Sequence, residues 1–208
     1  METPICIICL EGGSLMDPSP CACKGTAGIH HACLMKLQET TLACPVCRQD
    51  YRTITDGTHT IVYSSGRKCV FDTVAGVRHG SFKEYDEVGV LLKSSVFDHG
   101  VLNGPYRIYH EDGKTHMIDC TYVRGCKQGS LYEYDEDGHV LSIEHYKDDK
   151  KHGSCVEYYT TADGGGIFQE YNAVEGLRDG PFIEYDKYGV QVLKHIYKEG
   201  RIICTMPG

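Results

Sequence analysis

The amino-acid sequence predicts two parts: a small zinc-stabilised module over residues 1–52 and an all-β repeat array of antiparallel hairpins over residues 53–208. Two observations lead to this prediction. Seven of the twelve cysteines fall within residues 6–47, in pairs at metal-ligand spacing. Beyond residue 53, a segment rich in glycine, tyrosine and acidic residues recurs every 24 to 27 residues, as in repeat arrays.

The N-terminal part holds its seven cysteines and one histidine in four pairs. These are Cys6–Cys9, Cys21–Cys23, His30–Cys33 and Cys44–Cys47, separated by 11, 6 and 10 residues. A structural zinc site takes four thiolate or imidazole ligands, and a short Cys-x2-Cys segment supplies two of them. Eight ligands suffice for two closed tetrahedra, which leave no coordination position for substrate. We therefore expect two structural Zn²⁺ ions and no catalytic metal.

These cysteines have two other interpretations, ordinary burial and a disulfide scaffold. Their clustering at ligand spacing argues against the first. Disulfides need an oxidising compartment, and the opening METPICIICLEGG has neither the basic start nor the long apolar core of a secretory signal. Reduced cysteines without such a signal favour a cytoplasmic or nuclear location.

The ligand order resembles that of the RING-CH (variant RING) zinc finger, with Cys-x-Cys in the middle and histidine as the fifth ligand. The segment CACKGTAGIHHACL is similar to the middle of that finger, including Gly25 and Thr26. The resemblance covers about a quarter of the chain and implies a cross-brace. One zinc would be held by Cys6, Cys9, His30 and Cys33, and the other by Cys21, Cys23, Cys44 and Cys47. Spacing alone leaves this pairing open, and His31 is an alternative to His30, which keeps the two-residue gap to Cys33.

Two further elements are expected in this finger. Apolar residues recur at helical spacing in ACLMKLQET, residues 32–40, which predicts a short helix. The resemblance adds a small hairpin. So small a module buries little surface, and zinc binding should supply much of its folding free energy.

RING-type fingers imply ubiquitin-protein transferase activity without a covalent intermediate, because such a finger acts by positioning a ubiquitin-charged conjugating enzyme. The docking surface implied by the resemblance comprises Ile8, Leu37 and Pro45. Arg48 follows the last ligand, where many active fingers carry a basic residue that contacts both ubiquitin and the enzyme. Leu37 departs from the tryptophan of membrane-type RING-CH fingers. Taken singly, these residues also suit a small core, a turn and a solvated charge.

Five segments of the C-terminal part share one pattern. They are VRHGSFKEYDEVG (77–89), VLNGPYRIYHEDG (101–113), CKQGSLYEYDEDG (126–138), KKHGSCVEYYTTADG (150–164) and LRDGPFIEYDKYG (177–189). Their leading glycines are Gly80, Gly104, Gly129, Gly153 and Gly180, and five residues later come Tyr85, Tyr109, Tyr134, Tyr158 and Tyr185. A second aromatic follows in each unit: Phe97, Tyr122, Tyr146, Tyr171 and Tyr197. Residues 53–76 look like a degenerate first copy.

Each unit is expected to form two strands. The first alternates over residues such as 81–85, a turn rich in Asp, Glu and Gly follows, and the second strand is apolar and aromatic, as in VLSIEHY. Alternation places one set of residues on one face and the five tyrosines above on the other. The first set is Phe82, Tyr106, Leu131, Cys155 and Phe182. We expect a long antiparallel meander with aromatic ladders on both faces.

This array resembles divergent MORN repeats over roughly three quarters of the chain, although a usual MORN unit carries a tryptophan and this chain has none. The resemblance implies an interaction surface or scaffold. Acidic residues lie at the expected hairpin tips, and we interpret them as solvated turns rather than a ridge for a basic partner. These residues are Asp86, Glu87, Glu111, Asp112, Asp135, Glu136 and Asp137.

Composition narrows the partners. The formal net charge of −8 argues against nucleic acid, and no stretch reaches the ~18 consecutive apolar residues of a membrane span. The RING-CH resemblance implies a ubiquitin-conjugating enzyme and ubiquitin as partners, and the MORN-like repeats imply a protein substrate or scaffold. The alternative is a non-catalytic structural protein, such as an assembly or virion component. RING-CH with MORN-like repeats resembles the repertoires of large DNA viruses, which would place the protein in host cytoplasm or virion.

Overall fold

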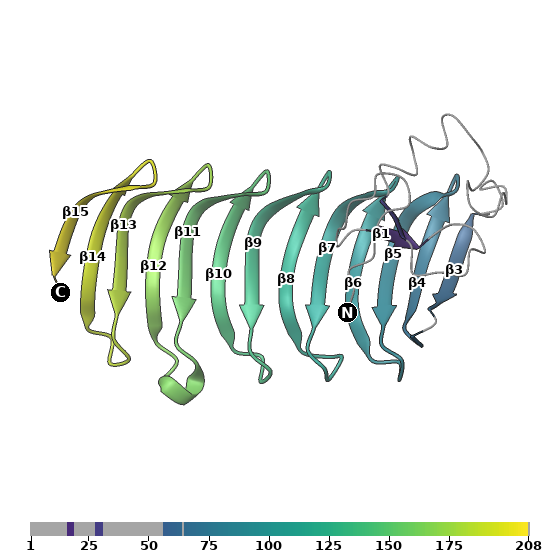
Figure 1. Cartoon of the computed structure of the whole chain (residues 1–208), viewed down its shortest axis with the longest axis horizontal. Coiled ribbons are helices and arrows are strands. Elements are labelled where there is room, and N and C mark those ends of the chain that lie inside the picture. The colour runs from purple at the N-terminus through teal and green to yellow at the C-terminus, as the bar shows by residue number, and fades with distance from the viewer. Residues whose placement is uncertain (1–15, 19–27, 31–55, 64, 208) are drawn as a thin grey trace.

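The computed structural model describes residues 16–18, 28–30, 56–63 and 65–207. Strands β1 (Met16–Pro18) and β2 (Gly28–His30) form a two-stranded antiparallel sheet, in which Met16 lies opposite His30. The rest of the described chain is one 13-stranded antiparallel sheet whose strand order follows the sequence (Figure 1). The predicted all-β array of hairpins is therefore confirmed for this part of the chain.

The 13 strands have similar lengths. They are β3 (Gly57–Val62), β4 (Lys68–Val74), β5 (Val77–Tyr85), β6 (Leu91–Asp98), β7 (Val101–Tyr109), β8 (His116–Val123), β9 (Cys126–Tyr134), β10 (Val140–Lys147), β11 (Lys150–Tyr158), β12 (Ile167–Val174), β13 (Leu177–Tyr185), β14 (Gln191–Lys198) and β15 (Arg201–Pro207). The degenerate first copy is the β3–β4 hairpin, which continues the sheet. The 3-10 turn η2 (Thr161–Asp163) lengthens the fourth unit.

Two-residue turns lie at one end of the strands, and the first residue of each has a positive φ. These turns are Ala75-Gly76, His99-Gly100, Arg124-Gly125, Asp148-Asp149, Glu175-Gly176 and Glu199-Gly200. Positive φ at both central positions is the type I′ geometry, whose twist suits a hairpin. These turns connect consecutive repeats.

The acidic turns lie at the opposite end of the strands. The Asp86 carboxylate accepts the amides of Val88 and Val90 at 3.0 and 2.7 Å, and Asp135 and Asp186 make the same pair of bonds. Asp112 accepts the Thr115 hydroxyl and two turn amides, which lowers the pKa of its carboxyl to about 2. These carboxylates close their own turns, in agreement with the interpretation of the tips as solvated turns.

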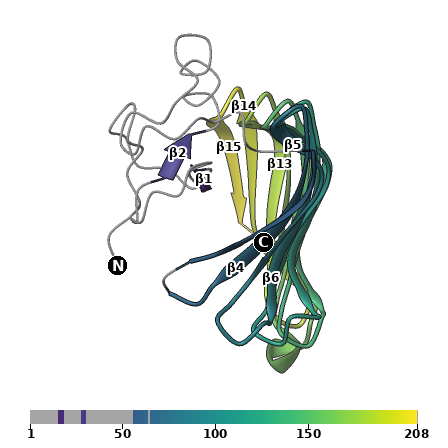
Figure 2. The ribbon, with the colours of Figure 1, turned by 90° about the vertical axis from the view of Figure 1, so that its right-hand side faces the viewer.

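The first strand of each unit begins about four residues earlier than predicted, because the leading glycine lies inside it. Gly80 has φ 86° in β5 and faces Phe97 of β6. Toward the preceding strand, Phe71 pairs with Phe82 and Thr73 with Arg78, so β5 bulges by two residues around this glycine. The bulge recurs in β7, β9, β11 and β13. Bulges bend strands, and the strands of the sheet are accordingly curved along their length (Figure 2).

Candidate functional site: the concave face of the array

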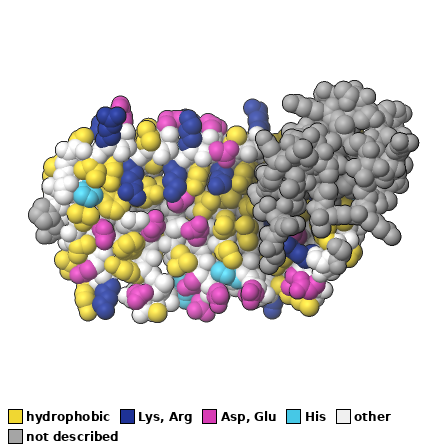
Figure 3. All heavy atoms as spheres, viewed as in Figure 1, with side chains coloured by type: hydrophobic (Ala, Val, Ile, Leu, Met, Phe, Trp, Pro, Cys, Tyr) yellow, Lys and Arg dark blue, Asp and Glu magenta, His cyan; other side chains and the backbone are white. Residues whose placement is uncertain are grey.

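In the described part of the array, the buried side chains all fall on one face by strand alternation. These residues are Cys69, Phe71, Thr73, Phe82, Ser95, Leu102, Cys120, Leu131, Ser142, Cys155, Tyr171, Ala173 and Phe182. Side chains inside a curve converge, so this is the concave face. Figure 3 views it, and shows a row of Lys and Arg side chains beside a band of hydrophobic ones. The predicted tyrosine ladder lies on the other, convex face, where Tyr185 donates to Glu170.

The concave face is built from glycine–aromatic pairs. Phe97 lies opposite Gly80, Tyr122 opposite Gly104, Tyr146 opposite Gly129, and Tyr197 opposite Gly180. A ring over a glycine fills the space that the missing side chain leaves, a known device for stabilising strand glycines. Burial raises the pKa of Tyr122 to about 12, so this phenol stays protonated at neutral pH.

In the fourth unit, the residue opposite the leading glycine is not aromatic. Ala173 lies opposite Gly153, and Tyr171 lies two residues earlier, opposite Cys155. Cys155 holds the position that Phe, Tyr or Leu occupies in the other units, so the small thiol makes room for the displaced ring. The ring of Tyr171 lies 6.3 Å from that of Phe182 in the next unit. Tyr171 therefore fills the core rather than covering a glycine.

A row of cations crosses the concave face at the second position of four strands, and we call it the cation row. It consists of Arg78, Lys127, Lys151 and Arg178. Each cation lies over an aromatic ring, with Lys127 Nζ 4.8 Å from the Tyr146 centroid and the Arg78 guanidinium 4.7 Å from that of Phe82. Cation–π attraction holds these charges in place.

Arg178, like Arg78, lies over three aromatic rings. Its guanidinium lies 4.7 Å from the ring centroids of Tyr171 and Phe182 and 5.5 Å from that of Tyr197. It also donates to the Tyr197 hydroxyl at 3.4 Å. A planar guanidinium can stack on several rings while its edge stays in water, which suits arginine to this position.

Lys151 is part of a hydrogen-bonded network with one carboxylate and two phenols. Its ammonium pairs with Glu144 and donates to the Tyr171 hydroxyl at 3.2 Å, while Tyr146 donates to Glu144 at 2.7 Å. Burial alone would lower the pKa of Lys151, but its bonds to Glu144 and Tyr171 outweigh burial and raise it. Burial and the bond to Glu144 raise the pKa of Tyr146. The lysine therefore stays charged in its partly buried place.

A second row, of carboxylates, runs parallel to the cations at the eighth position of the same four strands. It consists of Glu84, Glu133, Glu157 and Glu184. Six residues separate the two rows along each strand, but the bulge takes up two of them. The β4 partners of Arg78 and Glu84 are four residues apart, which is about 13 Å at 3.3 Å per residue. Strand β7 carries Leu102 and Ile108 at the two positions, so both rows are interrupted at one place. The face thus carries a cation row and a carboxylate row along an aromatic band, and Lys93 lies opposite Glu84 in the second row.

Replacing Arg178 by alanine should lower the free energy of unfolding by about 1–2 kcal/mol, since three cation–π contacts and the packing of the side-chain stem are lost. Arg201→Ala is the matched control: Arg201 is exposed at the start of β15 and should change stability by less than about 0.5 kcal/mol. Urea denaturation of both variants measures the difference. Equal stabilities would mean that the cation row does not hold the sheet together.

Two buried cysteines of the described part, Cys69 and Cys120, lack the setting of a reactive thiol. Burial raises the pKa of the Cys69 and Cys120 thiols, whereas a nucleophilic cysteine needs a lowered pKa. His116, close to Cys120 in sequence, packs on the other face against the Tyr109 ring at 5.1 Å.

The sequence-predicted site falls almost entirely outside the described residues. This holds for the zinc ligands Cys6, Cys9, Cys21, Cys23, Cys33, Cys44 and Cys47, and for the docking residues Ile8, Leu37, Pro45 and Arg48. The backbone of His30 lies on β2, and its side chain is outside the described part. Zinc binding and enzyme docking remain predictions.

Sequence reasoning missed the cation row, although a signal for it exists. Each cation lies two residues before the leading glycine, as in VRHG, CKQG, KKHG and LRDG. Once these glycines are placed inside a strand, alternation puts the cation on the same face as Phe82 and its equivalents. The turn expected at the glycine concealed this periodicity.

Comparison with known proteins adds little to this geometry. No protein-family model and no curated protein matches the sequence. One solved structure with partial similarity is a mutant of S. aureus TarM in complex with fondaparinux, alpha-GlcNAc-glycerol and UDP. The match has 10% identity and a TM-score of 0.28, over 59% of this chain and 21% of the other. The chain thus spans about a fifth of that protein's length. At this TM-score the likeness says nothing about function.

Proposed function

We propose that the chain is a RING-type ubiquitin ligase with an N-terminal RING-CH finger and a C-terminal MORN-like docking array. The four ligand pairs over residues 6–47 carry this proposal, since eight thiolate and imidazole groups at knuckle spacing suit two structural zincs. The finger would bind a charged conjugating enzyme through Ile8, Leu37 and Pro45, with Arg48 contacting ubiquitin. Attack on the thioester would come from a substrate lysine, so this chain forms no covalent intermediate.

The array would supply the second half of the activity by holding a protein substrate or scaffold. Its concave face supports this role, because it carries two charge rows of opposite sign about 13 Å apart. The cations are already ordered by aromatic rings, so a partner would meet groups that lose little further freedom on binding. Among the described residues, no helix is long and apolar enough to cross a membrane.

The test is ubiquitin-chain formation with a panel of conjugating enzymes, using the full-length chain and its Ile8→Ala and Arg48→Ala variants. Both variants should keep their zinc, because neither residue is a predicted ligand, and both should lose chain formation by at least about tenfold, which corresponds to about 1.4 kcal/mol of lost interaction. Ile203→Ala and Arg201→Ala are matched controls on the exposed strand β15. They should retain full activity.

The alternative function gives a different result. If the finger is a folding and protein-binding module, the wild-type chain binds two zinc ions but forms no ubiquitin chains with any enzyme of the panel. Leu37, in place of the tryptophan of membrane-type RING-CH fingers, favours this second function. Activity that survives both Ile8→Ala and Arg48→Ala would overturn the proposed docking surface.

A further inference from the structure

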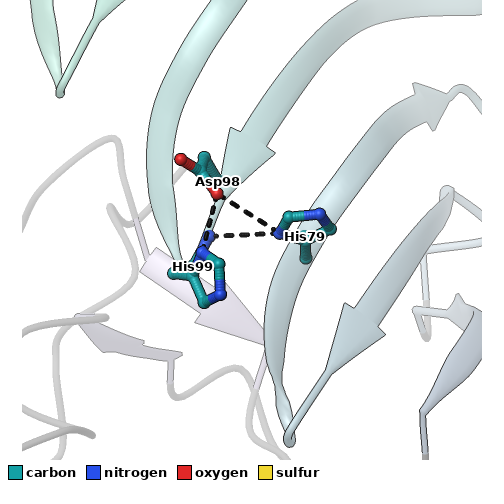
Figure 4. Close-up of side chains that lie close together, drawn as sticks. All are labelled: His79, Asp98 and His99. Atoms are coloured by element: carbon teal, nitrogen blue, oxygen red, sulfur yellow. Dashed lines mark hydrogen bonds and ion pairs between the residues drawn. The ribbon is translucent and has the colours of Figure 1, made fainter.

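Two histidines and an aspartate lie close together at the two-residue turn between β6 and β7. His79 lies on β5, Asp98 ends β6, and His99 begins the turn (Figure 4). The Asp98 carboxylate oxygen Oδ1 lies 2.7 Å from His99 Nδ1 and 3.4 Å from His79 Nδ1. One ligand atom from each of the three residues lies within 4.8 Å of the other two. The cluster is partly exposed, and it is separate from the concave face.

The backbone fixes all three residues. The Gly100 amide donates to the Arg78 carbonyl at 2.6 Å, which ties the turn to β5 next to His79. Asp98 pairs with Val101 across the hairpin, and His99 holds φ 45° as the first residue of the turn. Because strand pairing sets these positions, the three side chains start from Cα atoms that have little freedom to move apart.

The equivalent positions in the other repeats provide an internal comparison. In the second repeat they are Asn103, Val123 and Arg124, where Asn103 Oδ1 accepts the Arg124 amide at 3.2 Å. In the fifth repeat, Asp179 accepts the Glu199 amide at 3.1 Å. In these two repeats, the side chain at this strand position accepts the turn amide. In the third repeat, Gln128 instead donates to the Asp148 carboxylate.

His79 accepts the turn amide only weakly. Its Nδ1 lies 3.5 Å from the His99 amide, at the limit of a hydrogen bond. The first repeat is thus the one whose acceptor is an imidazole nitrogen with a weak bond, next to a second imidazole and a carboxylate. Exchanging this weak bond for a metal bond costs the turn little.

We propose that His79, Asp98 and His99 form a Zn²⁺ site with an open coordination position. Two imidazoles and one carboxylate are a zinc donor set, with metal–ligand distances near 2.0–2.2 Å, so ligand atoms in a tetrahedron lie about 3.3 Å apart. The His79–Asp98 separation already matches this value. The His99–Asp98 pair opens by about 0.6 Å on binding, through rotation of two exposed side chains. Water or a donor from a partner protein completes the tetrahedron.

The second His/Asp cluster of the array does not share these properties. Asp135, Asp137 and His139 also lie within 4.8 Å of one another. However, Asp135 already accepts the amides of Asp137 and His139 at 3.0 and 2.8 Å. Its carboxylate is engaged in closing the turn, as in the turns at Asp86 and Asp186, so a metal would compete with the hairpin itself.

Zinc titration of the full-length chain tests the site. The protein is dialysed against zinc-free reducing buffer, which leaves tightly held zinc in place, and Zn²⁺ is added by isothermal titration. The variants His79→Asn and His99→Arg carry the second-repeat residues, so the turn keeps an amide acceptor and the fold is preserved. His152→Asn is the matched control, since His152 occupies the same strand position but faces only Glu175, at 3.6 Å.

The wild type and His152→Asn should bind one more equivalent of Zn²⁺ than either test variant, or bind it at least about tenfold more tightly, since even loss of an outer-shell partner costs 10–100-fold. Long-range ¹H–¹⁵N spectra provide the second readout: zinc should shift the Nδ1 signals of His79 and His99, but not that of His152. Equal zinc uptake by wild type and both test variants, or unshifted Nδ1 signals, would overturn the site. Neither result depends on ligase activity.

Discussion

Replacing Phe182 by alanine is expected to lower the free energy of unfolding by about 3–4 kcal/mol, within the range for buried phenylalanines. Phe182 is 6% exposed and packs with Cys155, Tyr171 and Ala173. Its ring lies 6.0 Å from that of His195, with which it stacks. Among the described residues, no second layer packs on the 13-stranded sheet to collapse into the space, so the cost of the lost packing is retained.

The control for Phe182 lies in the same repeat. Tyr188 sits in the following turn and is 80% exposed, so Tyr188→Ala removes an aromatic ring without removing core packing and should cost less than about 0.5 kcal/mol. Urea denaturation followed by circular dichroism compares the two variants with wild type. If the two variants were equally stable, the concave face would not be the core of the array.

Replacing Gly113 by alanine should cost about 2–3 kcal/mol, for two separable reasons. Gly113 has φ 65°, a conformation that costs a residue with a side chain about 1 kcal/mol. In addition, a Cβ at this position would lie 2.6 Å from Val90 Cγ1 and 3.1 Å from the Leu91 amide nitrogen in the preceding hairpin. The second distance involves backbone, so the two hairpins would have to move apart.

Gly89→Ala separates these two contributions. Gly89 is the equivalent residue of the preceding acidic turn, with φ 92°, and an added Cβ there meets nothing within 4 Å. This variant should lose only the backbone part, about 1 kcal/mol. Thermal and urea unfolding of both variants measure the gap. A Gly89 variant as unstable as the Gly113 variant would show that the contact with Val90 is unimportant.

The sequence was sufficient to predict the hairpins and their faces, because both follow from short-range patterns. Second strands such as VLSIEHY match β10 to within one residue. The alternation that placed Phe82 and Tyr85 on opposite faces is confirmed by the contacts of Phe82 with Phe97 and of Tyr85 with Lys68. Local periodicity survives folding when each strand pairs only with its neighbours in sequence.

Other features depend on register and could not be predicted from the pattern. Gly80 resembles a turn residue in the sequence, but it forms a bulge inside β5, and the curvature of the sheet follows from such bulges. In the fourth unit, Tyr171 lies opposite Cys155 and not opposite the leading glycine, and this shift depends on where the longer turn of that unit ends. Likewise, His79 and His99 are 20 residues apart and meet only because β5 and β6 pair at Gly80 and Phe97.

The order of the 13 strands has a consequence for biosynthesis. Every pairing joins a strand to the one made just before it, so no segment leaving the ribosome has to wait for a later partner. A repeat of 24 to 27 residues takes more than about a second to synthesise, whereas a hairpin closes in about 1–10 μs. The sheet can therefore grow one hairpin at a time from β3 toward β15, and each new strand finds a finished edge as its template.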